Sequence, residues 1–215
     1  MKKLLLLFIC FVISFPIFSQ INDLIPVNEN YPYSKWTKEI VKEANTAENI
    51  EYLDKEEKMV IFYCNLVRKN GNLFASTFLE NYVDSKQLKK NDYVTSLYKD
   101  LNSVKDLPLL ESQKDLYEIA KEHAINSGKT GHVGHKGFDK RFKNVLGKKY
   151  YTIAENCDYG NDKALDIVMS LLIDEGIPSL GHRKNILEEK MNSIGVSIRI
   201  HKTYRFNCVM DFGGR

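Results

Sequence analysis

The sequence predicts an α+β protein in which helices come first and a β-hairpin closes the chain. Helical periodicity dominates residues 54–128. Two runs near the end, 194–200 and 206–212, alternate apolar and other residues with the period of strands. One further strand and one helix lie between these two regions. Because the helices and strands do not alternate regularly, this order favours α+β layers over a doubly wound parallel sheet.

The first 19 residues have the layout of a secretory signal peptide. Lys2 and Lys3 precede an apolar run over residues 4–18, and the small Ser19 offers a cleavage point. A single-pass anchor is the alternative, but the run is shorter than the ~20 residues that a span needs. We therefore expect a secreted or periplasmic protein from which residues 1–19 are removed.

Composition and charge indicate a globular chain. The 215 residues are 43% hydrophobic and 11% aromatic, which is enough for a core and excludes global disorder. Loss of the two leader lysines lowers the formal net charge from +3 to +1, so nucleic acid is not an expected partner. No later apolar run reaches ~18 residues, so stable membrane insertion is not expected either.

Residues 20–54 are expected to form an N-terminal extension that packs on a domain of residues 55–215. Residues 20–35 have the Asn, Pro and Tyr content of irregular structure, and residues 36–44 fit a short helix. The extension contains Tyr31, Tyr33, Trp36 and Ile40, whose apolar surface is costly to leave in water. We therefore predict that Trp36 is buried.

The domain begins with helices. Asp54 and Glu57 form a capping-box pattern that opens a helix. Gly71 is expected to interrupt the pattern, which resumes over residues 73–83 and 93–101. The clearest helix follows Ser112, and Gly128 is its predicted C-cap. A glycine-rich loop over residues 129–137 and a short helix over 138–146 come next.

The second half of the domain carries the strands. Residues 150–157 have strand character, and Asn161 is expected to cap a helix that ends near Asp174. The closing hairpin should turn within residues 201–204.

The histidines are the first candidates for chemistry. His132 and His135 lie in the glycine-rich loop, which suits a ligand-facing position, and His182 precedes a short helix. The alternative is a loop histidine that merely bonds a backbone carbonyl. We interpret His123, within a helix, as structural and His201, near the hairpin turn, as solvated.

Acidic residues provide candidate partners. Glu155 lies in an apolar strand, where a buried carboxylate needs a partner. Asp174 and Glu175 end an apolar helix, where negative charge opposes the helix dipole; a solvated helix end is the alternative. The sequence contains no zincin motif, nucleophile elbow, phosphate loop or dinucleotide fingerprint.

Five motifs occur together in the order of a known family. They are Asn65-Leu66-Val67-Arg68, Gly134-His135-Lys136-Gly137-Phe138 with Arg141, Ala154-Glu155-Asn156, Gly181-His182-Arg183-Lys184-Asn185-Ile186-Leu187, and Ile194-Gly195-Val196 with Val209-Met210-Asp211-Phe212. Over residues 55–213 the chain resembles the CAP superfamily, also called the SCP domain, which contains cysteine-rich secretory, antigen-five and pathogenesis-related proteins. The bacterial branch is the most similar.

The resemblance implies a three-layer α-β-α sandwich with a central antiparallel sheet and a cleft with two histidines and two acids. His135 and His182 match the histidines, Glu155 matches the first acid, and Glu175 the second, with Asp174 as a possible substitute. Two imidazoles and two carboxylates can hold a divalent cation of the zinc class. The carboxylates could instead bond the second nitrogen of each ring and fix its tautomer.

These features suggest a binding or effector module with a metal-capable cleft for a small-molecule, lipid or peptide ligand. A metal-dependent hydrolase of peptide or cell-wall material is the alternative, and a structural domain with a vestigial cleft is a third reading. Whether the protein is an enzyme stays open, although the lack of a recognisable serine or cysteine nucleophile favours binding.

Three cysteines follow the leader: Cys64, Cys157 and Cys208. Cys64 falls in a helical core pattern and is expected to be packed. A bridge between Cys157 and Cys208 is expected if their strands are neighbours with suitable Cα spacing, and two small buried thiols are the alternative.

Overall fold

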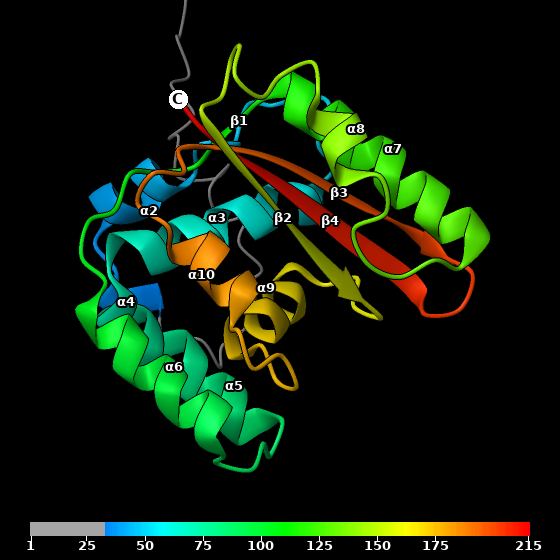
Figure 1. The fold of residues 1–215 in the computed structure, drawn as a ribbon. Coiled ribbons are helices and arrows are strands. Elements are labelled where there is room, and N and C mark those ends of the chain that lie inside the picture. Colours follow the sequence, from blue (N-terminus) through cyan, green and yellow to red (C-terminus); the bar gives the residue numbers. More distant parts are fainter. Residues whose placement is uncertain (1–32) are drawn as a thin grey trace, which may run out of the picture.

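The computed structural model describes residues 33–215, so the predicted signal peptide and the first part of the extension lie outside the described residues. At the centre is a four-stranded sheet in the order β1-β3-β4-β2 (Figure 1). The strands are β1 (Glu111–Ser112), β2 (Thr152–Tyr159), β3 (Ser193–His201) and β4 (Arg205–Gly214). The predicted antiparallel pairing holds for β2, β3 and β4, whereas the short β1 runs parallel to β3. The sheet is therefore mixed.

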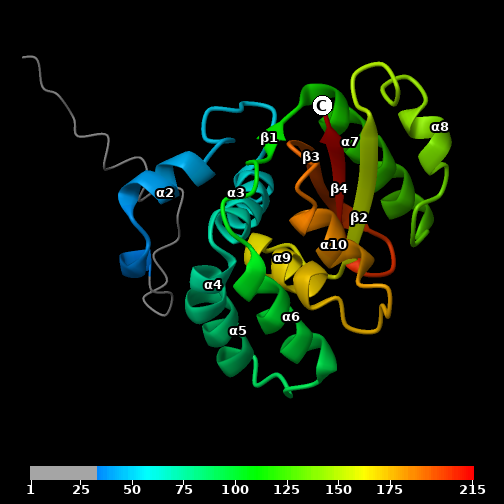
Figure 2. The same cartoon turned by 60° about the vertical axis from the view of Figure 1, so that its left-hand side comes forward.

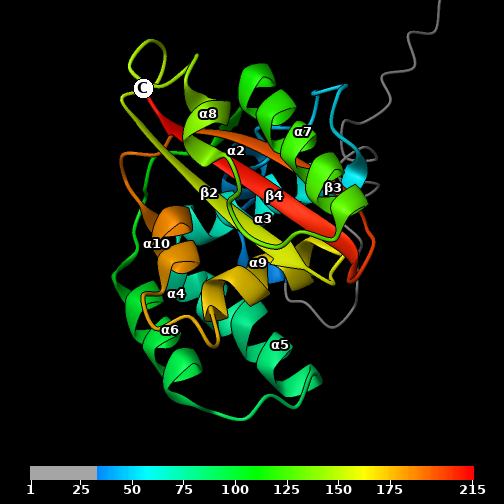
Figure 3. The same cartoon turned by 45° about the vertical axis from the view of Figure 1, so that its right-hand side comes forward.

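Helices cover both faces of this sheet, as the predicted α-β-α sandwich requires. One face carries α7 (Lys114–Thr130), with α8 (Phe138–Phe142) beside it. The other face carries α3 (Lys55–Lys69), α9 (Ala164–Ile173) and α10 (Gly181–Leu187). Figures 2 and 3 show the strands between these two helical layers.

A further helical group lies beyond α9. It consists of α4 (Gly71–Phe74), the π-helical turn η2 (Ala75–Leu79), α5 (Glu80–Ser85) and α6 (Asp92–Ser103). Gly71 begins α4, and a Cβ there would lie 2.3 Å from the carbonyl oxygen of Leu101. The glycine that we expected to interrupt the helical pattern thus also allows close contact with α6.

The structure confirms the predicted capping box at the start of α3. The backbone nitrogen of Glu57 donates to Asp54 Oδ1 at 2.9 Å, and that of Asp54 donates to Glu57 Oε2 at 3.0 Å. These reciprocal bonds satisfy two donors that the helix itself leaves free.

Two predicted caps are wrong. Gly131, with a φ of 75°, ends α7, while Gly128 lies within the helix against β3. Lys163 is the N-cap of α9, because the side chain of Asn161 donates instead to both oxygens of Asp158.

The described part of the extension lies against the helical group. It contains η1 (Tyr33–Lys35) and α2 (Lys38–Ala44), and α2 packs on α3. Trp36 is buried, and its Nε1 donates to Thr77 Oγ1 at 3.1 Å. The indole therefore has both an apolar environment and a hydrogen-bond partner.

All three described cysteines are free and buried, so the predicted Cys157–Cys208 bridge is wrong. In the β2–β4 register, Cys157 is opposite Val209 and Cys208 is opposite Asp158. This offset of one residue directs the two thiols to opposite faces of the sheet. Cys64 is packed in α3, as expected.

Within residues 33–215, no helix combines the length and the apolar character needed to cross a membrane.

A candidate two-histidine site

The edge strand β2 and the loop between α7 and α8 bring the first pair of predicted residues together. His135 Nδ1 lies 2.8 Å from Glu155 Oε1. The side chain of Glu155 is 1% exposed, whereas that of His135 is 47% exposed. The carboxylate is therefore a buried anchor for an imidazole that faces solvent.

Arg141 completes the environment of Glu155. Its Nη1 donates to Oε2 at 2.5 Å and its Nη2 donates to Oε1 at 3.0 Å. Burial alone would raise the pKa of Glu155, but the hydrogen bonds from His135 and Arg141, together with the charge of Arg141, lower it to about 2. Both oxygens of this carboxylate thus already have partners in the protein.

A second pair forms on the other side of β2. His182 Nδ1 lies 2.7 Å from Asp174 Oδ1, and the backbone nitrogen of His182 donates to Oδ2 at 2.9 Å. Asp174 ends α9 with a φ of 57°, and Leu180 precedes α10 with a φ of 52°. Positive φ is unfavourable for non-glycine residues, so the segment that positions His182 is bracketed by two strained residues.

The structure brings Asp174, the substitute named by the resemblance, and not Glu175 to His182. Glu175 Oε1 instead accepts from Asn91 Nδ2 at 2.8 Å on an exposed part of the surface. The physical reason is the left-handed conformation of Asp174, which turns its carboxylate towards the start of α10.

The two imidazoles face each other across the edge of β2, with ring centroids 6.4 Å apart. In each ring Nδ1 faces a carboxylate, and among residues 33–215 neither Nε2 has a hydrogen-bond partner. When Nδ1–H donates to a carboxylate, Nε2 is left with its lone pair available. This arrangement fits two nitrogen ligands to a cation, with Glu155 and Asp174 as orienting partners.

Two asparagines, which were part of the motifs but had no assigned role, connect the second pair to the sheet. Asn156 Nδ2 donates to the carbonyl oxygen of His182 at 2.9 Å, and Asn185 Nδ2 donates to Asn156 Oδ1 at 2.8 Å. Arg183 is buried and binds the carbonyl oxygens of Leu172 and Ile173. These contacts fix α10 against β2 and α9.

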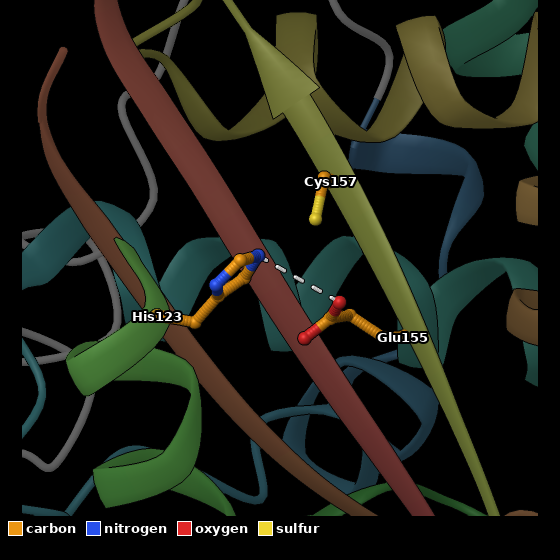
Figure 4. A group of neighbouring side chains, drawn as sticks. All are labelled: His123, Glu155 and Cys157. Carbon is orange, nitrogen blue, oxygen red and sulfur yellow. Dashed lines mark ion pairs between the residues drawn. The ribbon is translucent and has the colours of Figure 1, made fainter. Parts of the chain in front are cut away.

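A second group with metal-ligand atoms lies beneath His135. His123, Glu155 and Cys157 offer atoms within 4.8 Å of one another and could hold a metal ion (Figure 4). However, His123 Nε2 is 2.9 Å from the carbonyl oxygen of Gly134, to which it must donate. Burial lowers the pKa of His123 and raises that of the Cys157 thiol. Metal binding here would therefore require rotation of the His123 ring and loss of the proton of the Cys157 thiol.

Sequence reasoning missed this group because His123 has the spacing of a core residue in α7. It also missed Asp211, the cross-strand partner of Glu155, which is fully buried with neither side-chain oxygen hydrogen-bonded within the described chain. Burial and the adjacent Glu155 raise the pKa of Asp211 well above its usual value. His123 carries no recognisable sequence signal, and Asp211 lies in the closing motif but had no assigned role.

A cavity of about 350 Å³ adjoins the second pair and is lined by His182, Asp174, Asp158 and Ser170, among others. Asp158 is 4% exposed. Burial raises its pKa to about 6, although hydrogen bonds from Ser170 and Asn161 partly oppose the shift. The cavity thus contains a carboxyl group that titrates close to neutral pH.

Comparisons with known proteins agree with the motif pattern. Residues 63–212 match the sequence model of the family described as CAP, the cysteine-rich secretory protein family. No curated protein sequence matches this chain significantly.

Solved structures with similarity to the chain come from three bacteria. An extracellular SCP-domain protein from Bacillus anthracis is 16% identical with a TM-score of 0.44, and the match covers 75% of this chain and 43% of that one. An outer surface protein from Borrelia burgdorferi is 25% identical with a TM-score of 0.42, and the match covers 61% of this chain and 92% of that one. A cysteine-rich secretory protein from Staphylococcus aureus is 21% identical with a TM-score of 0.39, and the match covers 60% of this chain and 41% of that one. The chain thus spans less than half the length of the first and third of these proteins.

Proposed function

Since this chain belongs to the CAP family of cysteine-rich secretory proteins, we propose that it is an exported binding or effector module whose cleft holds a divalent cation, zinc in our hypothesis, through His135 and His182. The ligand is a small molecule, lipid or peptide that reaches the same cleft. Export rests on the family and on the leader-like residues 1–19.

The observation that supports this proposal is the matched orientation of the two rings. Each Nδ1 lies 2.7–2.8 Å from a carboxylate oxygen, which fixes the tautomer that leaves Nε2 free. Imidazole nitrogen is a preferred zinc ligand, and a site with few protein ligands keeps positions for water or an external ligand. In this proposal Glu155 and Asp174 orient the rings and raise their basicity, and Glu175 has no role.

The test is a zinc titration of the purified protein by calorimetry. His135→Ala and His182→Ala should each abolish specific binding, while His132→Ala, in the same loop, should spare it. Asp174→Asn should weaken zinc affinity about 10–100-fold, as is typical when an orienting partner is lost. Glu175→Gln is the matched control and should bind as the unmodified protein does; a loss of affinity in this variant alone would refute the assignment.

The cavity beside His182 favours metal-dependent hydrolysis as a second candidate function. A carboxyl whose pKa of about 6 lies near the working pH is what a general acid or base requires. In this alternative Asp158 exchanges protons with a peptide or cell-wall substrate in the cavity. Zinc-dependent turnover of a peptide library, lost in both His182→Ala and Asp158→Asn, would establish it, and no turnover at any pH from 5 to 8 would reject it.

A further inference from the structure

A polar groove lies between α7 and α8, next to the two-histidine site, with which it shares Arg141. Its volume is about 470 Å³. The groove is lined from α7 by Glu122 and Asn126, and from the loop, α8 and the turn after α8 by His132, Lys136, Lys140 and Asn144. We refer to these residues as the α7–α8 groove. His135 does not line it, because its ring is turned to Glu155.

The groove carries an excess of positive charge. Lys136 and Lys140 are exposed, and neither forms an ion pair within residues 33–215. Arg141 lies at the groove as well, but its charge is matched by Glu155. Glu122 is the sole acid among the lining residues. Two lysines against one acid leave the groove with a net positive charge, which attracts an anion.

Neutral hydrogen-bonding groups accompany this charge. The side-chain amides of Asn126 and Asn144 are exposed on opposite walls, and neither has a hydrogen-bond partner among the described residues. The imidazole of His132 lines the same groove. Amide and imidazole N–H groups can donate to the oxygens of an anion while the lysines supply the charge.

The loop that forms one wall is held in place by the neighbouring structure. His201 Nε2 bonds the carbonyl oxygen of His132 at 3.1 Å, and its Nδ1 accepts from the backbone of the hairpin turn. His201 is 1% exposed, so its predicted solvation is wrong. The backbone nitrogen of Gly134 donates to the hydroxyl oxygen of Tyr159 at 2.8 Å. Little ordering of this wall is therefore needed when a ligand binds.

We propose that the α7–α8 groove binds an anionic group of a ligand, a carboxylate or a phosphate, with Lys136 and Lys140 as counter-charges and His132 as a hydrogen-bond donor. The inference uses the charge and shape of the groove and is independent of cation binding by His135 and His182. It also gives His132 a role, which the two-histidine site does not.

The experiment titrates the full protein with inorganic phosphate and, separately, with a tetra-aspartate peptide, following backbone amide shifts by NMR. Shifts should centre on the loop and α8. The double variant Lys136→Gln/Lys140→Gln should weaken binding at least tenfold. Lys89→Gln/Lys90→Gln is the matched control, because these lysines are also exposed and form no ion pair within the described chain. The control should bind as the unmodified protein does.

The results of these titrations distinguish specific binding at the α7–α8 groove from non-specific attraction. Binding of phosphate alone or of the peptide alone supports the groove and identifies the source of the anionic group. Equal weakening in both double variants would mean non-specific attraction and would overturn the proposal, as would shifts that centre elsewhere. Zinc affinity should be unchanged in Lys140→Gln, so a failure of the cation site and a failure of the groove can be told apart.

Discussion

Glu155 is the residue on which the first half of the two-histidine site depends. It is buried, and it accepts from both His135 and Arg141. Glu155→Gln would leave the Arg141 guanidinium partly buried without its counter-charge, which typically costs about 3–5 kcal/mol. We expect urea unfolding at pH 7 to show that Glu155→Gln lowers the free energy of unfolding by this amount.

The pH dependence of this loss follows from the pKa of Glu155, which is lowered to about 2. The stability that a lowered pKa contributes is present above the ordinary value of 4.5 and is lost as the pH falls through the folded value. The difference between the unmodified protein and Glu155→Gln should therefore narrow from pH 7 to pH 3. A difference that stays constant over this range would contradict the assigned ion pair.

Asp158 should have the opposite pH dependence. Its pKa of about 6 lies above the ordinary 3.8, so ionisation favours the unfolded state and stability is lost as the pH rises from 4 through 6. A shift of about two units corresponds to at most about 3 kcal/mol. Asp158→Asn should therefore unfold at higher urea concentration than the unmodified protein at pH 7.5, but at a similar one at pH 4. Lower stability of the variant at both pH values would show that the carboxyl is needed for packing instead.

The resemblance named three of the four side chains that the structure pairs here, and local conformation decided the fourth. His135, Glu155 and His182 lie in recognisable motifs. The choice between Asp174 and Glu175 depends on which residue adopts positive φ, and a non-glycine residue gives little sign of that in a sequence. His201 was misjudged because its position beside a turn does not show that a loop far away in the sequence covers it.

Among the elements, the contact between α7 and β3 imposes the strictest steric condition. A Cβ at Gly128 would lie 2.2 Å from the carbonyl oxygen of Ile200, so α7 can approach the strand only because this residue is glycine. Alanine normally stabilises a helix interior by up to about 1 kcal/mol relative to glycine. Here Gly128→Ala should destabilise the fold by about 1–3 kcal/mol, the usual cost of overpacking.

Thermal unfolding checks this expectation. Lys129→Ala, at the next and exposed position of α7, is the control and should change the melting temperature little. A higher melting temperature for Gly128→Ala would mean that the helix can move away from β3 at no cost.

Sequence patterns predicted most elements but not all of their ends. Periodicity identified the helices from α3 to α7 and the hairpin of β3 and β4 because these segments are long and strongly patterned. Gly128 and Gly131 are equivalent as sequence signals, and tertiary packing decides which one caps α7. β1 has two residues and no period of its own, so its pairing with β3 could not be predicted.

At the scale of the whole molecule, the extension is expected to contribute to stability. Trp36 is 5% exposed and packs near Phe78, with a ring-centroid distance of 6.1 Å. Trp36→Ala should cost about 3–5 kcal/mol. Lys35 is exposed, so Lys35→Ala serves as the control in thermal unfolding. Unchanged melting of Trp36→Ala, or of a mature form that begins at residue 50, would show that the extension contributes nothing to the fold.

The strand order has a consequence for the timing of folding. Every pair of strands in the described sheet includes β3 or β4: β1 pairs with β3, β2 with β4, and β3 with β4. These two strands span residues 193–214, after all the described helices. On the ribosome, β1 and β2 thus have no strand partner until residues 193–214 have been synthesised.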